Sequence, residues 1–207
     1  YGQRVPDLML PPARLDRWVE NFATRHGETQ LSVMSGSLLG QADDGSHFSM
    51  RLPFDRAYDG AAQLDDFRAA TAAPPLWGVL LVRKGGFAIA RLEGEELVAS
   101  KTGQRHVQGR TKAGGQSQQR FARRRDNQAR AAFEAAGEHA ARLLLAPTPV
   151  PTLVVGGDHA AVQATLDEPR LKPLVAAQTR RFITTADPRR AVLESAVVEA
   201  QAIEVSV

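Results

Sequence analysis

Apolar residues in the first 70 positions follow two different patterns. Leu15, Trp18 and Phe22 recur at helical spacing after Pro11-Pro12, and Gly27 supplies a stop signal, which together predict a helix of about four turns. Short apolar runs near 31–33, 38–39 and 48–52 are separated by Ser-Gly and Asp-Asp-Gly-Ser turns, and they predict a small antiparallel sheet. A further short helix is expected at 64–70.

The pattern changes at residue 76, where the apolar runs become longer and more continuous. Residues 76–82 and 87–90 flank a Lys-Gly-Gly turn and predict a hairpin, and residues 97–100, with 106–107, predict one or two more strands. Apolar residues then recur at spacings of three and four from 121 to 145, which predicts a long helix that ends before Pro147. The remainder predicts a strand at 152–155, a helix at 158–166, a strand at 181–185 and a final helix from Pro188.

This order of elements predicts an α/β protein of two parts. We expect residues 1–72 to form an N-terminal helix and small antiparallel sheet. Residues 73–207 are expected to form the larger domain, with one mixed sheet that carries helices packed on it. Within that domain, residues 109–119 form a polar, Gly-rich loop with no apolar residue larger than Ala113, so they are not predicted to be a core element.

Composition agrees with a folded, soluble chain. The 207 residues are 43% hydrophobic and 24% charged, the proportions of ordinary globular proteins. No cysteine is present, which excludes disulfides, thiolate metal sites and a cysteine nucleophile. No apolar run approaches the roughly 20 residues that a membrane-spanning helix needs. We therefore expect a cytoplasmic protein without a membrane association.

The charge is distributed unevenly along the chain. Residues 101–130 hold nine basic residues and one acid, a net charge of +8, whereas the other 177 residues hold 17 basic and 22 acidic residues, a net charge of −5. Seven of the nine basic residues are Arg, and the single acid is Asp126. Arg favours planar, bidentate contacts with phosphates. A concentrated basic stretch on a mildly acidic body is typical of a surface that binds RNA phosphates, and the alternative is a solvated helix face.

The centre of this basic stretch is the tripeptide Gly114-Gly115-Gln116, the GGQ motif of peptide-release factors. It lies in the polar loop, follows the predicted strands and leads into the basic helix. The string from Lys112 to Gln118, with the Arg-rich segment after it, resembles the Vms-like release factor (VLRF) family of peptidyl-tRNA hydrolases, and in particular its actinobacterial type. The resemblance is specific across about 76–145 and weak across the first 70 residues.

The resemblance implies both a fold and an activity. The fold would be the ribonuclease H-like catalytic domain of eukaryotic and archaeal class I release factors, with a long helix after the GGQ loop. The activity would be hydrolysis of peptidyl-tRNA, which releases nascent chains from stalled ribosomes or large subunits in ribosome rescue and quality control. The implied partners are peptidyl-tRNA and the peptidyl-transferase centre of the large ribosomal subunit with its ribosomal RNA. We expect a monomer that uses no cofactor.

The resemblance also implies roles for individual residues. Gly114 and Gly115 allow the loop to enter a narrow RNA-lined cavity, and Gln116 positions the water that attacks the ester or stabilises the oxyanion. An amide does not ionise near neutral pH, so Gln116 is not a general base. The candidate RNA-binding residues share positive charge or an amide, and they are Arg110, Lys112, Gln118, Arg120, Arg123, Arg124 and Arg125.

Two other functions stay open at this point. One is a nuclease that cuts the acceptor end of tRNA, and the other is a non-catalytic module that binds the ribosome or tRNA. The five His residues show no ligand spacing, so we predict no metal site. Gly156-Gly157-Asp158 could cradle a phosphate, but a plain turn with a helix-capping Asp is the favoured interpretation. Trp18 and Trp77 are predicted to belong to the core.

Overall fold

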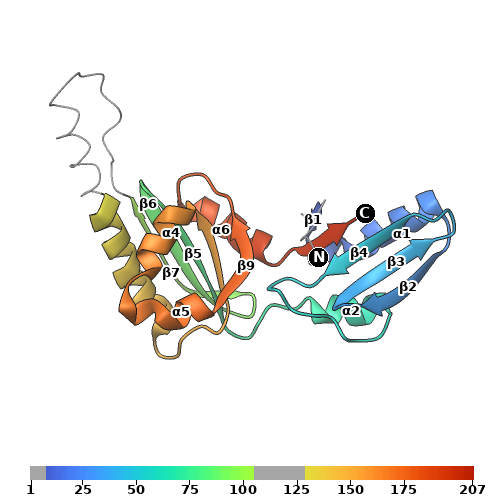
Figure 1. Ribbon diagram of the computed structural model, residues 1–207, viewed down its shortest axis with the longest axis horizontal. Coiled ribbons are helices and arrows are strands. Elements are labelled where there is room, and N and C mark those ends of the chain that lie inside the picture. Colours follow the sequence, from blue (N-terminus) through green and yellow to red (C-terminus); the bar gives the residue numbers. More distant parts are fainter. Residues whose placement is uncertain (1–7, 105–128) are drawn as a thin grey trace, which may run out of the picture. The chain divides into compact units, whose positions relative to one another are not determined.

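The computed structural model describes residues 8–104 and 129–207, and it divides the chain into two compact units. The first unit combines residues 1–73 with residues 197–207, and the second unit comprises residues 74–196. Each unit has its own sheet (Figure 1). The boundary after Ala73 lies beside the predicted one, but the prediction assigned every residue from 73 to 207 to the second domain. Residues 197–207 instead join the first unit, because the last strand pairs there.

The sheet of the first unit is antiparallel throughout, in the order β1-β10-β4-β3-β2. Its strands are β1 (Leu8–Leu10), β2 (Thr29–Met34), β3 (Ser37–Ala42), β4 (His47–Arg51) and β10 (Ile203–Ser206). The helices of this unit are α1 (Leu15–His26) and α2 (Leu64–Ala70). β2 and β3 form a tight hairpin, in which Ser35 and Gly36 both adopt positive φ, the backbone that a two-residue turn between twisted strands requires.

The core of the first unit lies between one face of this sheet and its helices. Phe22 of α1 packs edge-to-face on Phe48 of β4, with ring centroids 5.0 Å apart, and Tyr58 packs in the same way on Phe67 of α2. Alternate residues of β2 and β4 are exposed instead, as expected for an antiparallel sheet with one covered face. The predicted core position of Trp18 agrees with this packing, since its ring lies 5.1 Å from that of Phe48.

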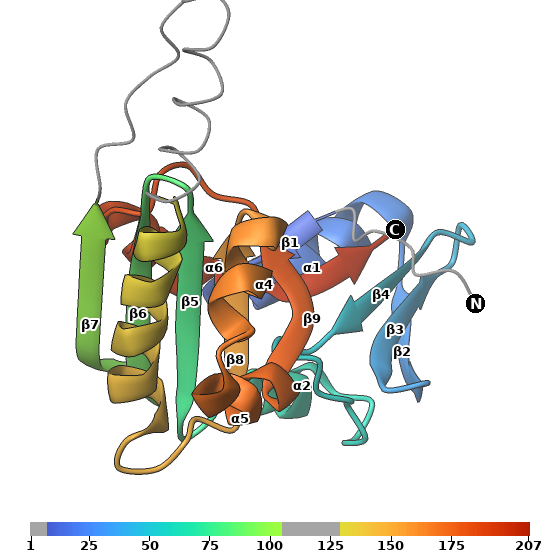
Figure 2. The ribbon, with the colours of Figure 1, turned by 60° about the vertical axis from the view of Figure 1, so that its left-hand side comes forward.

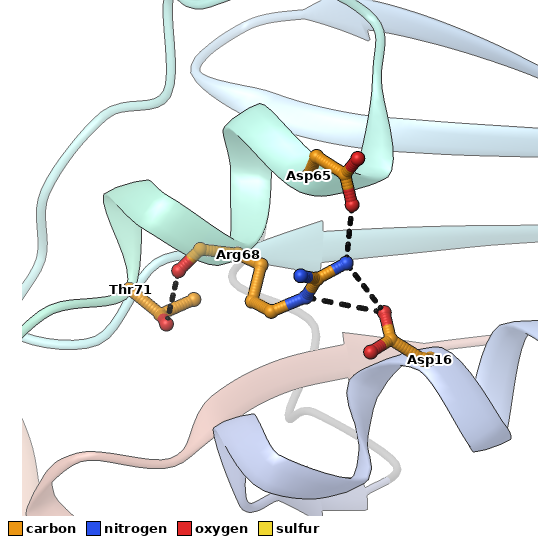
Figure 3. Close-up of polar contacts among 4 residues, drawn as sticks. All are labelled: Asp16, Asp65, Arg68 and Thr71. Atoms are coloured by element: carbon orange, nitrogen blue, oxygen red, sulfur yellow. Dashed lines mark hydrogen bonds and ion pairs between the residues drawn. The ribbon is translucent and has the colours of Figure 1, made fainter.

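A charged cluster on the surface connects α2 to α1 (Figure 3). The guanidinium of Arg68 in α2 donates to Asp65, one turn earlier, and to Asp16 of α1, at 3.1 Å. The hydroxyl of Thr71 donates to the backbone carbonyl of Arg68 and so extends the last turn of α2. All three charged side chains are well exposed, so the aromatic core rather than this cluster holds the helices in place.

The sheet of the second unit is mixed, in the order β7-β6-β5-β8-β9. Its strands are β5 (Trp77–Arg83), β6 (Gly86–Glu93), β7 (Glu96–Gln104), β8 (Leu153–Gly157) and β9 (Gln178–Ile183). β5, β6 and β7 form an antiparallel meander, while β8 runs parallel to β5 and β9 parallel to β8. β5, β7, β8 and β9 therefore all point the same way, and we call the side where they end the carboxyl edge.

Helices cover both faces of this sheet (Figure 2). One face carries the helix at residues 129–140 with its π-helical last turn (Ala141–Leu145), together with α4 (His159–Leu166) and α5 (Lys172–Ala176). The other carries α6 (Arg190–Ala200). All residues from Trp77 to Val82 are buried, which explains why the sequence of β5 is apolar without alternation. Trp77 is fully buried as predicted, and its indole N–H donates to the carbonyl of Gly94 at 2.8 Å.

The helix that ends at Leu145 is anchored at its carboxyl end. Ala136, Ala140 and Leu144 are fully buried on one face of it, as their spacing of four predicts. Arg91 of β6 is buried nearby, and its guanidinium donates to the carbonyls of Leu143 and Thr148 at 3.3 and 3.0 Å. The first bond satisfies a carbonyl that the helix end leaves without an intrahelical partner, and the second holds the loop that follows the helix. The first part of the predicted helix, residues 121–128, lies outside the described residues.

Three elements were missing from the sequence prediction. Strands β1 and β10 have only three and four residues, and each gains its partner from the opposite end of the chain, as in the pairing of Leu8 with Val205. The short helix α5, which begins at Lys172, was missed as well. β9 starts at Gln178, three residues earlier than predicted.

Candidate functional site

The predicted site lies outside the described residues, in 105–128. This range contains the proposed catalytic residues Gly114, Gly115 and Gln116. It also contains every candidate RNA-binding residue, namely Arg110, Lys112, Gln118, Arg120, Arg123, Arg124 and Arg125. What the structure describes is the part of the second unit from which this range starts and to which it returns.

Both ends of the range lie at the carboxyl edge (Figure 2). β7 ends there at Gln104, which pairs with Gly86, the first residue of β6. The helix that is described from residue 129 begins at the same side of the sheet. In open sheets of this kind, ligands bind beyond the carboxyl ends of the strands, since loops from several parallel strands meet there. The predicted site residues are therefore inserted where a binding site is expected.

The β5–β6 turn supplies positive charge to the same edge. Arg83 is half-buried, and its guanidinium donates to the backbone carbonyl of Thr185 and lies 3.9 Å from Asp187. Those contacts connect the turn to the loop that follows β9. Lys84, the next residue, is exposed. Counting charge by sequence segment missed this pair because they lie 17 residues or more before the basic stretch.

The turn after β8 shows the predicted cap rather than an open phosphate site. Asp158 is the N-cap of α4, and its carboxylate accepts a hydrogen bond from the N–H of Ala161 at 3.0 Å. An anionic side chain already occupies the helix N-terminus, which disfavours a bound phosphate there. Beside it, the ring of His159 stacks on Phe182 of β9, with centroids 3.5 Å apart.

A hollow of about 1000 Å³ lies between the helix at 129–140 and the segment from α4 to Arg170. Lys84 and Arg130 line it together with Phe133, and carboxylates from both walls line it as well. Arg170 crosses between these walls, because its guanidinium donates to Glu138 at 2.5 Å and pairs with Glu168. The hollow is thus lined by both positive and negative side chains.

One histidine of the helix at 129–140 has a perturbed pKa. Burial lowers the pKa of His139 below its usual value, and the charges of Arg142 and Lys101 lower it further. His139 lies against the ring of Phe87 and its Nδ1 is 2.7 Å from an Nη atom of Arg142. The imidazole is therefore neutral at pH 7 and accepts a hydrogen bond from Arg142.

The described residues contain neither a cluster of metal ligands nor a membrane-spanning helix. Within 8–104 and 129–207, no group of three or more His, Asp or Glu side chains is placed to hold a metal ion. None of the helices in these ranges is long and apolar enough to span a bilayer.

The comparison with family models decides the classification. Residues 75–206 match the family described as Actinobacteria/chloroflexi VLRF1 release factor. The chain belongs to this family. The matched range includes the whole GGQ motif, which lies at 114–116, and it begins within two residues of the boundary between the two units. Membership confirms the predicted resemblance and gives this VLRF1 family member a role in translation.

Comparison with solved structures finds archaeal proteins of low sequence identity. The crystal structure of the archaeal translation termination factor aRF1 aligns at a TM-score of 0.48 and 17% identity, covering 94% of this chain and 63% of that chain. Pelota from Archaeoglobus fulgidus aligns at a TM-score of 0.34 and 14% identity, covering 96% of this chain and 65% of that chain. The VLRF1 chain spans less than two thirds of the length of both structures. No curated protein matches its sequence.

Proposed function

We propose that this VLRF1 family member is a peptidyl-tRNA hydrolase that releases nascent chains from stalled ribosomes or large subunits. The observation that carries the proposal is the release-factor family match across residues 75–206, which encloses Gly114-Gly115-Gln116. The positions of β7 and of the helix described from residue 129 also support the proposal. The ends that flank residues 105–128 both lie at the carboxyl edge, where ligands bind in sheets of this kind. We also propose that the protein acts as a cytoplasmic monomer.

The proposed chemistry needs positioning more than acid–base catalysis. Gln116 would orient the attacking water at the ester between peptide and terminal ribose, or stabilise the developing oxyanion, by its backbone N–H or its side-chain amide. Gly114 and Gly115 would let the backbone approach RNA without side-chain clashes. The basic residues from Arg110 to Arg125 would hold tRNA or ribosomal RNA by their phosphates. No metal or cofactor takes part in this proposal.

The order of the strands supports the proposed ribonuclease H-like description of the second unit. A three-strand meander, a helix, and then two strands parallel to the first build a mixed sheet with both faces covered. We propose that this unit is the catalytic domain.

The test is release of labelled peptide from purified large-subunit complexes that carry peptidyl-tRNA. We expect Gln116→Ala to lower the release rate by about 10²–10³-fold, the usual cost of losing a positioned donor, and to retain binding. The matched control is Gln119→Ala, which removes an amide three residues away and should release at the wild-type rate.

The same assay separates the other two functions. Equal release by wild type and Gln116→Ala would contradict the catalytic role and leave a binding module. Gel analysis of the tRNA after the reaction tests nuclease action, because a tRNA shortened at its 3′ end, with the released peptide still esterified to the excised nucleotides, would contradict ester hydrolysis.

A further inference from the structure

Among the described residues, the turns at the two ends of β6 carry opposite charge. The β5–β6 turn at the carboxyl edge contains Arg83 and Lys84, whereas the β6–β7 turn at the opposite edge contains Glu93, Glu95 and Glu96. Both turns flank the same strand, β6, so the charge reverses along its length. An anionic partner is therefore attracted to the carboxyl edge and repelled from the other.

Contacts of Arg83 hold the positively charged β5–β6 turn in place. Arg83 connects the β5–β6 turn to the loop after β9 by its bond to the Thr185 carbonyl and its approach to Asp187. Asp187 also lies close to the turn itself, since its carboxylate is within 3.9 Å of the position of a Cβ on Gly85. Two loops that are distant in the sequence thus form one surface.

Three exposed basic residues lie on this surface or next to it. Lys84 follows Arg83 directly, Arg130 faces the same hollow as Lys84, and Arg189 follows Asp187 by two residues. All three are exposed, and none has an ion-pair partner among the described residues. By contrast, Arg190 is paired with Glu194 at 2.6 Å. Exposed cations without ion-pair partners are suited to phosphate oxygens.

We propose that Lys84, Arg130 and Arg189 form a phosphate-binding surface for an RNA backbone, separate from residues 110–125. This inference rests on the proposed function, because it assigns a second contact to the same RNA partner. Lys84 and Arg189 lie outside the basic stretch at 101–130, so its charge does not account for them. The surface sets the direction in which the carboxyl edge approaches RNA, while the segment that leaves β7 carries the chemistry.

Acidic side chains also line the hollow and limit where an RNA backbone can lie. Glu134, Glu138, Asp167 and Glu168 line it, and Arg170 pairs with Glu138 and Glu168. A phosphate would be repelled by these carboxylates, so the backbone is expected to lie beside Lys84 and Arg130 instead. The competing partner is an acidic protein surface, which the same cations would attract.

The test compares two double variants that remove the same charge. Lys84→Gln/Arg189→Gln removes one Lys and one Arg from the carboxyl edge. The control, Lys172→Gln/Arg142→Gln, removes one of each from α5 and from the last turn of the helix that ends at Leu145, both exposed positions toward the other side of the sheet. The probe is a fluorescent RNA duplex with a single-stranded 3′ end, and binding is measured by anisotropy over a range of salt concentrations.

We expect the edge variant to bind roughly tenfold more weakly at low salt and to lower the slope of log K against log salt by about two. The control should keep the wild-type slope, and equal melting temperatures show that both variants fold. Equal slopes for the two variants would overturn the proposal. So would an edge variant that keeps its affinity for RNA but loses affinity for polyglutamate, since the surface would then serve an acidic protein.

The result of the RNA-binding measurement does not depend on whether the protein hydrolyses peptidyl-tRNA. Binding to bare RNA requires no hydrolysis, so wild-type release by Gln116→Ala would contradict the proposed hydrolase and leave the salt slopes unaffected. Conversely, equal slopes together with a loss of release by Gln116→Ala would overturn the phosphate-binding surface alone.

Discussion

The two sheets differ in how much of their surface is covered. In the first unit, β2 and β4 alternate between covered and exposed residues, so one face of the sheet is open. In the second unit every residue from Trp77 to Val82 is buried, because helices cover both faces. A sheet covered on both sides can offer a ligand only its edges and strand ends. This difference explains why Arg83 and Lys84, in a turn at the end of β5, are placed where a ligand of the second unit could reach them.

The largest expected effect comes from a core leucine in the doubly covered sheet. Leu80→Ala on β5 removes a fully buried side chain of the main cluster, and we expect it to lower the free energy of unfolding by about 2–5 kcal/mol. The control is Leu39→Ala on β3, a half-buried position on the open side, where about 1 kcal/mol or less is expected. Urea denaturation measures both values. Equal losses would show that the two sheets do not differ as described.

A glycine at the carboxyl edge should give the next largest effect. Gly157 ends β8 with φ of 105°, and a Cβ there would lie 2.3 Å from the carbonyl oxygen of Val82. Gly157→Ala is expected to cost about 2–4 kcal/mol, because backbone strain and a steric clash add.

Gly45→Ala in the first unit separates those two costs. Gly45 has φ of 87° but no atom within 4 Å of the position of a Cβ, so its replacement should show the strain alone, about 1–2 kcal/mol. Thermal unfolding of both variants tests this order. A smaller loss for Gly157→Ala than for Gly45→Ala would show that the β8 end can move away from β5.

A moderate effect is expected from the N-cap of α4. Asp158→Ala removes the acceptor for the Ala161 N–H and should cost about 1 kcal/mol, while Asp158→Asn keeps an acceptor and should cost less. Both are measured by urea denaturation. If Asp158→Ala proved neutral, the cap would not hold the β8–α4 turn, and the choice of a plain turn over a phosphate cradle would lose its support.

The sequence predicted local features of the second unit well, since its signals are strong. The continuous apolar run at β5 indicates a strand that is buried on both faces, and the spacing of four from Ala136 to Leu144 indicates a helix with one buried face. β1 and β10 could not be predicted in this way. They form by pairing with each other and with β4, as in the pairing of Glu204 with Arg51, and these partners lie far apart in the sequence. For the same reason the last residues of the chain were assigned to the wrong unit.

The site shows the same division between local and long-range information. Gly114-Gly115-Gln116 is recognisable from adjacent residues, and it lies in the range that the family match covers. The contact of Arg83 with Thr185 joins residues 102 positions apart, so only the folded chain reveals that the β5–β6 turn lies against the loop after β9. A sum of charge along the sequence finds a charged segment, whereas a charged surface requires the fold.

The smallest predicted effect is the pH dependence that His139 adds to the stability of the second unit. Its pKa is lowered from the usual 6.5, so below pH 6.5 the unfolded chain binds a proton more readily than the folded chain does. Stability from this group is therefore complete above pH 6.5 and falls as the pH drops from there toward the folded pKa. His139→Gln should flatten the profile in that range, as measured by urea midpoints, and the control is His47→Gln, which replaces an exposed histidine at the start of β4 in the first unit. If His139→Gln kept the wild-type slope, proton uptake elsewhere would cause it, and burial against Phe87 would not hold the imidazole neutral.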